Sequence, residues 1–239
     1  MIRSRSDDRE RVTPPGSRAR LDETDHGRLI AAVPWTQTGL VKDEAERANG
    51  MSHTTIADLR RLLAAPTGGR SFILGPTLPE AAVHDFDVRF ALALPQEYHL
   101  FLTRVGNGGR LPGESGDWVL TPLAETHGGQ SAASPFPITA ERMRERLATL
   151  QNGLVPPDEE PFPELEHLWE HGDLPPGCLE VGRYPGGDAI LLITSGDLRG
   201  SVWCSVNLGT PELTPAGEPL GFLDWFADAL RELSADPGA

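Results

Sequence analysis

The sequence of 239 residues is acidic, with a formal net charge of −14 and a mean hydropathy of −0.29. It contains no apolar stretch of about eighteen residues that would predict a membrane span, and its charged first residues have no apolar stretch behind them that would encode a secretory signal. The two cysteines, Cys178 and Cys204, are too few for a disulfide framework and lack Cys-x-x-Cys spacing, so we expect both to be reduced and buried in a cytoplasmic protein.

The negative charge is concentrated after residue 50. Residues 1–50 carry nine basic and nine acidic side chains, so the whole excess of −14 lies in residues 51–239. Such a field repels the phosphates of nucleic acids and anionic lipids, and it accelerates encounter with a basic protein. The composition therefore predicts a protein partner with a basic surface, and no direct binding to nucleic acid or membrane.

Residues 1–50 are predicted to form a disordered leader. They combine many charges with Pro14-Pro15-Gly16 and almost no aromatic side chains, which leaves too little apolar surface to offset the entropy lost on folding. The apolar segment 29–35 is either a short docking segment or an incidental patch, and Met51 is an alternative start of translation. We expect one folded domain over residues 51–239.

Three helices are predicted in the first half of this domain. A Thr-x-x-Asp capping box at 55–58 begins the first helix, and a Thr-x-x-Glu box at 77–80 begins the second. Pro95 suits the first turn of the third helix, and the glycines from Gly106 onward end it. Each helix carries an apolar face, formed by Ile56, Leu59 and Leu63, by Val83, Phe86 and Phe90, and by Tyr98, Phe101, Leu102 and Val105.

The middle of the chain gives weaker patterns. Residues 118–120 are predicted to be a short strand, and Thr139 is predicted to cap a helix that ends near Gln151. The segment at about 156–176 is bounded by prolines, is rich in acidic residues and has room for about two helical turns. We call this segment the acidic insert.

Three strand-like runs follow, at residues 178–181, 189–194 and 201–206, and the glycine-containing turns between them predict an antiparallel meander. The second run is apolar at consecutive positions, which predicts a central strand covered on both faces. The third run alternates apolar and polar residues, which predicts one wetter face. A last helix from Gly221 carries an apolar stripe, so the pattern as a whole predicts an α+β domain with helices packed on one small antiparallel sheet.

A further pattern runs through the domain in a fixed order. It begins with Leu94-Pro95, Tyr98, Phe101-Leu102 and Asn107-Gly108-Gly109, and it continues with Pro122-Leu123, Gly187-Asp188, Gly200, Trp203, Phe222 and Trp225. In this order the set resembles the signature of the SUKH superfamily, the Smi/Knr-type proteins. The chain departs from that signature in its leader, in the long connection 124–176 and in the glycine loop at 110–116.

The resemblance implies a single α+β domain that binds another protein, without a cofactor and without turnover. Bacterial members of the family are largely immunity proteins that neutralise cognate polymorphic toxins, often nucleases or deaminases, and other members are regulatory interaction modules. On this basis we expect an immunity protein that acts by stoichiometric binding to a basic toxin domain. A regulatory or scaffold domain is the alternative.

The acidic insert supplies the candidate partner-binding residues. These carboxylates either form a solvated loop or imitate the phosphates that a basic toxin holds in its active site. The residues concerned are Asp158, Glu159, Glu160, Glu164, Glu166, Glu170 and Asp173. Three aromatic residues beside the predicted strands are either core residues or exposed binding anchors: Trp118, Tyr184 and Trp203.

The same insert contains the one enzymatic pattern that we weigh. His167, Glu170 and His171 match the inverted zincin motif, in which two histidines four apart on a helix bind zinc and the glutamate handles protons. The helix between the prolines is short, and a third zinc ligand would have to come from elsewhere in the chain. A zinc-dependent hydrolase is therefore the remote alternative, and we predict neither a metal nor another cofactor.

Overall fold

The computed structural model describes residues 54–65, 71–113, 116–126, 131–151, 162–165, 174–205 and 209–234. The chain divides after Met51 into two units, and all of these residues belong to the second unit, Ser52–Ala239. The predicted leader 1–50, its apolar segment 29–35 and the alternative start at Met51 lie outside the described residues, so they stay predictions.

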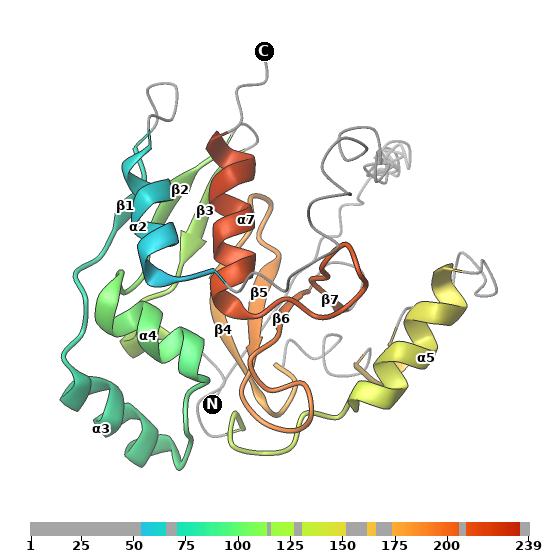
Figure 1. Cartoon of the computed structure of the whole chain (residues 1–239). Helices are drawn as coiled ribbons and strands as arrows, with labels where there is room; N and C mark the ends of the chain where they lie inside the picture. The colour runs from blue at the N-terminus through green and yellow to red at the C-terminus, as the bar shows by residue number, and fades with distance from the viewer. Residues whose placement is uncertain are drawn as a thin grey trace, which may run out of the picture. The chain divides into compact units, whose positions relative to one another are not determined.

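The strands among the described residues form one antiparallel sheet, in which each strand pairs with the next along the chain (Figure 1). They are β1 (Ile73–Leu74), β2 (Gly109–Pro112), β3 (Asp117–Leu120), β4 (Cys178–Arg183), β5 (Ala189–Ile193), β6 (Val202–Cys204) and β7 (Thr210–Pro211). The predicted meander is β4–β6. The sheet is wider than the sequence predicts. β1 and β7 have only two residues each and cannot display a strand pattern, and β2 lies where the sequence predicts only the end of a helix and a glycine loop.

The described helices are α2 (Ile56–Ala64), α3 (Glu80–Phe90), α4 (Gln96–Arg104), α5 (Ala140–Gln151) and α7 (Phe222–Ser234), with a short 3-10 helix, η2 (Leu123–Glu125). Helices α2, α4 and α7 lie together over one face of the sheet, which we call the inner face (Figure 1). The predicted α+β class, with helices packed on an antiparallel sheet, is thus confirmed. Each of these helices is too short or too polar to cross a membrane.

Two helix starts follow their capping signals. The Asp58 N–H donates to Thr55 Oγ1 over 3.2 Å and the Thr55 N–H donates to Asp58 Oδ2 over 3.0 Å, which is the predicted capping box of α2. The hydrogen bonds from Thr55 hold the pKa of the Asp58 carboxyl below its ordinary value. At α5, the Arg142 N–H donates to Thr139 Oγ1 over 3.2 Å, as predicted.

The second predicted capping box is wrong. Helix α3 starts after Pro79, whose side chain makes no capping hydrogen bond, and not at Thr77. The Leu78 N–H donates to the Leu102 carbonyl over 2.9 Å, so the residues before α3 are tied to α4 instead of to the helix start. Pro95 is likewise the residue before the first turn of α4, with an extended ψ of 139°.

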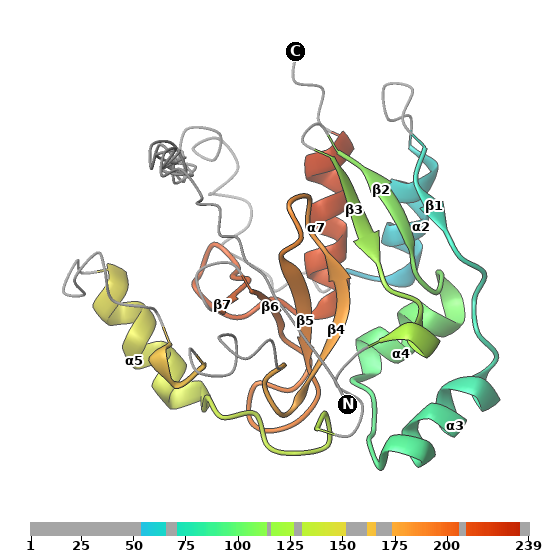
Figure 2. The same cartoon turned by 180° about the vertical axis from the view of Figure 1, so that it is seen from behind.

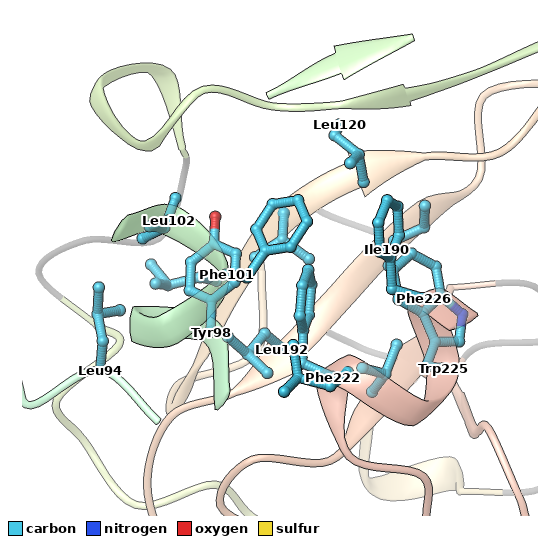
Figure 3. Close-up of a cluster of buried hydrophobic side chains, with 14 of the residues drawn as sticks. Leu94, Tyr98, Phe101, Leu102, Leu120, Ile190, Leu192, Phe222, Trp225 and Phe226 are labelled. Carbon is cyan, nitrogen blue, oxygen red and sulfur yellow. The ribbon is translucent and has the colours of Figure 1, made fainter. Parts of the chain in front are cut away.

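The larger core fills the space between the inner face and its helices. Phe222 and Phe226 of α7 meet Phe101 of α4 at ring-centroid distances of 5.1 and 5.0 Å, and Tyr98 lies edge-on to Phe222 at 4.8 Å (Figure 3). All four rings are buried. Because each large apolar side chain contributes about 1.5–3 kcal/mol when it is buried, the predicted apolar stripe of α7 is a main anchor of the fold.

A second, smaller core lies on the opposite, outer face of β4–β6. Trp203 of β6 is fully buried there against Phe136 and Phe162, at ring-centroid distances of 5.1 and 5.2 Å. Met143 of α5 belongs to the same cluster. The predicted wetter face of the third strand is therefore wrong, because described residues of the connection 124–176 cover that face and all of β6 is buried.

Both cysteines are free and buried, as predicted. Burial, with a smaller effect from the nearby Glu180 carboxylate, raises the pKa of the Cys178 thiol to about 12. The thiol is therefore neutral at physiological pH and behaves as a small apolar side chain, not as a nucleophile.

Candidate protein-binding site

Most residues that carry the family resemblance lie in the two cores. The buried ones are Leu94, Pro95, Tyr98, Phe101, Leu102, Gly108, Leu123, Trp203, Phe222 and Trp225. Figure 3 shows most of these side chains converging between α4, α7 and the sheet. The residues of the family resemblance thus mainly stabilise the packing of the fold, and they do not by themselves indicate which residues contact a partner.

The glycine loop after α4 also has a structural explanation. Asn107 Oδ1 accepts the Leu123 N–H over 2.8 Å, which ties the loop to the turn after β3. Gly108 has φ 72°, and a Cβ there would lie 2.8 Å from the Pro122 nitrogen. A Cβ on Gly109 would lie 2.3 Å from a backbone oxygen of β1. Only glycine allows this close approach of three chain segments.

Gly187 and Asp188 form the turn between β4 and β5. The Gly187 N–H donates to the Tyr184 carbonyl over 3.0 Å, and the Tyr184 N–H donates to the Asp188 carbonyl over 2.8 Å. Gly187 has φ 104°, a conformation that other residues rarely adopt. This part of the resemblance is therefore also a turn requirement.

Of the acidic residues proposed for partner binding, the described part of the insert includes only Glu164. Arg142 of α5 donates through Nε to Glu164 Oε1 over 2.9 Å. Burial raises the pKa of Glu164, but hydrogen bonds from its own backbone N–H and from Arg142 outweigh that effect and leave the pKa below its ordinary value. Glu164 thus already has a counter-ion within the chain.

The other candidate acids of the insert lie outside the described residues, namely Asp158, Glu159, Glu160, Glu166, Glu170 and Asp173. His167 and His171 of the zinc pattern lie outside them as well. Within the residues that the structure does describe, no group of three or more His, Cys, Asp or Glu side chains could hold a metal ion. The partner-binding and zinc interpretations of the insert stay predictions.

The three aromatic candidates pack against the cores. Trp203 is fully buried, and Trp118 and Tyr184 are partly buried with ring centroids 4.7 Å apart. The Tyr184 hydroxyl donates to Glu212 Oε1 over 2.7 Å, and Trp225 Nε1–H donates to the same hydroxyl over 3.3 Å. These side chains are therefore core residues with internal partners and not exposed anchors.

The outer face of β1–β3 is the uncovered half of the sheet as far as the described residues go (Figure 2). Ile73, Arg110, Val119 and Arg183 are direct cross-strand neighbours there, and Ile73 and Val119 are 65% and 39% exposed. We call this row the open half-face. Its two arginines are paired within the chain, Arg110 with an aspartate of β3 at 3.2 Å and Arg183 with a glutamate of β4 at 2.7 Å. The row therefore has no net charge with which to select a partner.

An open groove of about 470 Å³ lies where the starts of α4, α5 and α7 meet the turn between β5 and β6. We call it the α4–α5 groove. Five apolar residues line it, and the first three of them are buried and form its floor: Pro95, Met143, Leu198, Ala140 and Pro219. Two positions of the family resemblance, Pro95 and Gly200, meet in this groove. Here two positions of that pattern lie beside charged side chains.

The charged residues of the groove fall into two groups. Glu97 Oε2 accepts the Leu223 N–H over 3.0 Å at the start of α7, and Arg199 Nη2 donates to the carbonyls of Ala93 and Leu94, both over 2.9 Å. These two side chains connect neighbouring segments of the groove wall through hydrogen bonds. A Cβ on Gly221 would lie 2.5 Å from Glu97 Oε2, so a larger residue there would displace the carboxylate that accepts the Leu223 N–H.

The second group is exposed on the rim and consists of Arg144, Asp197 and Glu218. Among the described residues, these three side chains make no hydrogen bond or ion pair. Within the described part of the chain, the groove thus combines an apolar floor with two carboxylates and one guanidinium that make no internal pair. Such a combination can bind an amphipathic side chain from another protein.

The sequence did not point to Asp197 or Glu218. Asp197 lies in a turn that is visible in the sequence only as a separator of two strands, and Glu218 lies in the segment between β7 and α7. The glycine and proline positions around them, Gly200 and Pro219, were the available signal. Nothing in a linear pattern brings these residues next to α4 and α5.

Comparisons of this chain with protein-family models, curated proteins and solved structures find no match. The SUKH resemblance therefore stays an expectation. The described residues form an α+β domain with an antiparallel sheet and an open, charged groove beside its two cores.

Proposed function

We propose that this chain is a cytoplasmic protein-binding domain of the immunity-protein type, which neutralises a cognate toxin by stoichiometric binding, with no cofactor and no turnover. The observation that carries the proposal is the α4–α5 groove, whose floor is apolar and whose rim carboxylates Asp197 and Glu218 have no partner among the described residues. The SUKH-like order of the core residues supports the same class of function.

The charge of the chain favours a basic partner. The whole excess of −14 lies in residues 51–239, and a field of this size accelerates the encounter of oppositely charged proteins. Toxins of the nuclease or deaminase type bind nucleic acid through basic surfaces. An acidic domain that covers such a surface would block access of the toxin to its substrate.

The groove is built on rigid parts of the fold, which lowers the entropic cost of binding. Met143 is anchored in the smaller core on the outer face of the sheet, and Pro95 is buried next to Leu94 of the larger core. Arg199 and Glu97 hold the walls to the backbone of neighbouring segments. A preformed site loses little conformational freedom when its partner docks.

The acidic insert would add a second, electrostatic contribution. We propose that its carboxylates speed association, while the groove provides the contact that persists in the complex. Reversing Glu159 and Glu160 to arginine should then slow association about tenfold at low salt and have little effect at high salt. Stopped-flow association at two ionic strengths measures this, and equal slowing at both would exclude a long-range role.

The proposal is tested by coexpression with a toxin encoded next to this chain. Full-length chain should restore growth of cells that express the toxin, and protection should rise with expression and be complete at about one chain per toxin, since binding is stoichiometric. Protection at far less than one chain per toxin would point to turnover. A lethal toxin against which the chain gives no protection would contradict the function.

The second candidate function is a regulatory or scaffold domain. The open half-face favours it, because Ile73 and Val119 offer a second surface that is separate from the α4–α5 groove. A scaffold binds two proteins at once, so a ternary complex that is lost on Val119→Asp but kept on Asp197→Arg would support this candidate over the first.

A further inference from the structure

We infer that the α4–α5 groove receives an arginine side chain of the partner, whose stem lies on the apolar floor and whose guanidinium is held by Asp197 and Glu218. This inference rests on the proposed function, because it names the partner group that the binding site takes. It assigns a role to two carboxylates that have no hydrogen bond or ion pair among the described residues.

The shape of the groove suits a long side chain with an apolar stem. Pro95, Met143 and Leu198 are buried residues that form the floor, and the charged groups stand on the rim. Arginine buries its three methylene groups along apolar surface while its charged head stays near water. A purely apolar side chain would leave the rim carboxylates without a counter-charge, and an acidic one would be repelled by them.

The charge balance of the rim calls for one positive charge. Glu97 and Arg199 already make hydrogen bonds within the chain. The remaining rim charges are two negative, Asp197 and Glu218, and one positive, Arg144, so their sum is minus one. One monovalent cationic group therefore neutralises the groove.

Guanidinium fits this arrangement better than ammonium. The two carboxylates come from different segments, the β5–β6 turn and the segment before α7. A guanidinium group presents five N–H donors in a planar fork and can bind two separate acceptors. It also loses less hydration than an ammonium group when it enters a partly apolar site.

The test uses a peptide probe and does not need the toxin. Full-length chain labelled with ¹⁵N is titrated with the capped peptide acetyl-Gly-Arg-Gly-amide and, separately, with the same peptide in which citrulline replaces arginine. Citrulline keeps the shape of arginine and lacks its charge. We expect saturable amide shifts at Gln96, Leu198 and Gly200, with a dissociation constant of about 1–10 mM for the arginine peptide and at least fivefold weaker binding of the citrulline peptide.

Two double variants with the same change in net charge separate local contact from general attraction. Asp197→Asn with Glu218→Gln should reduce the shifts at least fivefold. Asp85→Asn with Glu125→Gln removes two exposed carboxylates outside the groove and should leave binding within twofold. If the first double variant does not fold, Glu218→Gln alone should give at least a twofold loss.

Three results would overturn the inference. These are no shifts at the groove, equal binding of the arginine and citrulline peptides, or equal losses in the two double variants. Failure of the inference and failure of the function are distinguishable. If the chain protects against the toxin but does not bind the arginine peptide in the groove, the inference alone is refuted. If the chain binds the peptide but gives no protection against the toxin, the proposed function is refuted.

Discussion

The Tyr184 hydroxyl donates a 2.7 Å hydrogen bond to Oε1 of Glu212, so a partly buried carboxyl of the segment after β7 is joined to the end of β4. Burial raises the pKa of Glu212, the hydrogen bond from Tyr184 partly offsets this, and the nearby carboxylate of Glu232 raises the pKa further. The net result is a pKa above the ordinary value of a glutamate.

This pair predicts a pH-dependent stability. A carboxyl whose pKa is raised on folding binds its proton more tightly in the folded chain, so it stabilises the fold at low pH, and that stability is lost as pH rises through the folded pKa. Glu212→Gln keeps an acceptor for Tyr184 and removes the charge. It should therefore raise the free energy of unfolding at pH 7.5 and change it little at pH 4, as measured by urea unfolding. A variant that is less stable at pH 7.5 would contradict this account.

Phe162 tests whether the acidic insert is part of the fold. Its ring is fully buried against Trp203, so Phe162→Ala should cost about 3–5 kcal/mol in urea unfolding. Val119→Ala, at the exposed position of the open half-face, should cost less than about 1 kcal/mol. Similar small costs for both variants would mean that the insert does not cover the outer face.

The glycine loop gives a prediction that separates crowding from backbone strain. Gly108→Ala places a Cβ 2.8 Å from the Pro122 nitrogen at φ 72°, whereas Gly186→Ala has a similarly unfavourable φ of 102° with nothing within 4 Å. We expect a cost of about 1–2 kcal/mol for Gly186→Ala and at least about 1 kcal/mol more for Gly108→Ala in thermal or urea unfolding. Equal losses of unfolding free energy in the two variants would mean that backbone strain alone, and not crowding against Pro122, sets the cost at Gly108.

Metal content tests the remote hydrolase alternative. The proposed function needs no metal, so full-length chain dialysed at neutral pH should hold much less than one zinc per chain, and His171→Ala should leave the amount unchanged. Elemental analysis of the wild-type chain and the variant measures this. Stoichiometric zinc that disappears in the variant would favour the zinc pattern at 167–171 over the binding function.

The sequence predicts the parts of the fold that depend on local patterns. The apolar stripe of α7 and the Thr55 capping box involve residues within a few turns of one another, so periodicity and spacing suffice to find them. The Thr77 box fails because a tertiary hydrogen bond from Leu78 to α4 decides where α3 starts. The predicted wetter face of the third strand is wrong because its cover comes from the connection 124–176, where Phe162 lies between two prolines and close to glutamates and therefore gives no sign of a core residue.

The groove could not be predicted for a related reason. Its floor and rim come from the starts of α4 and α5, the β5–β6 turn and the segment before α7, so the residues that meet are far apart in sequence. Pro95 and Gly200 belong to the pattern of the family resemblance, but that pattern does not indicate that they meet in a groove. The carboxylates of the acidic insert instead predicted a binding site in a different segment, where Glu164 pairs with Arg142.

The most direct measurement is isothermal titration calorimetry of the cognate toxin domain with the full-length chain and two charge-reversed variants. We predict one chain per toxin for the wild type, at least a hundredfold loss of affinity for Asp197→Arg with Glu218→Arg, and a much smaller loss for Asp85→Arg with Glu125→Arg, which changes the net charge equally. Absence of binding by the wild type, or equal losses in the two variants, would contradict the claim that the α4–α5 groove is where this protein holds its partner.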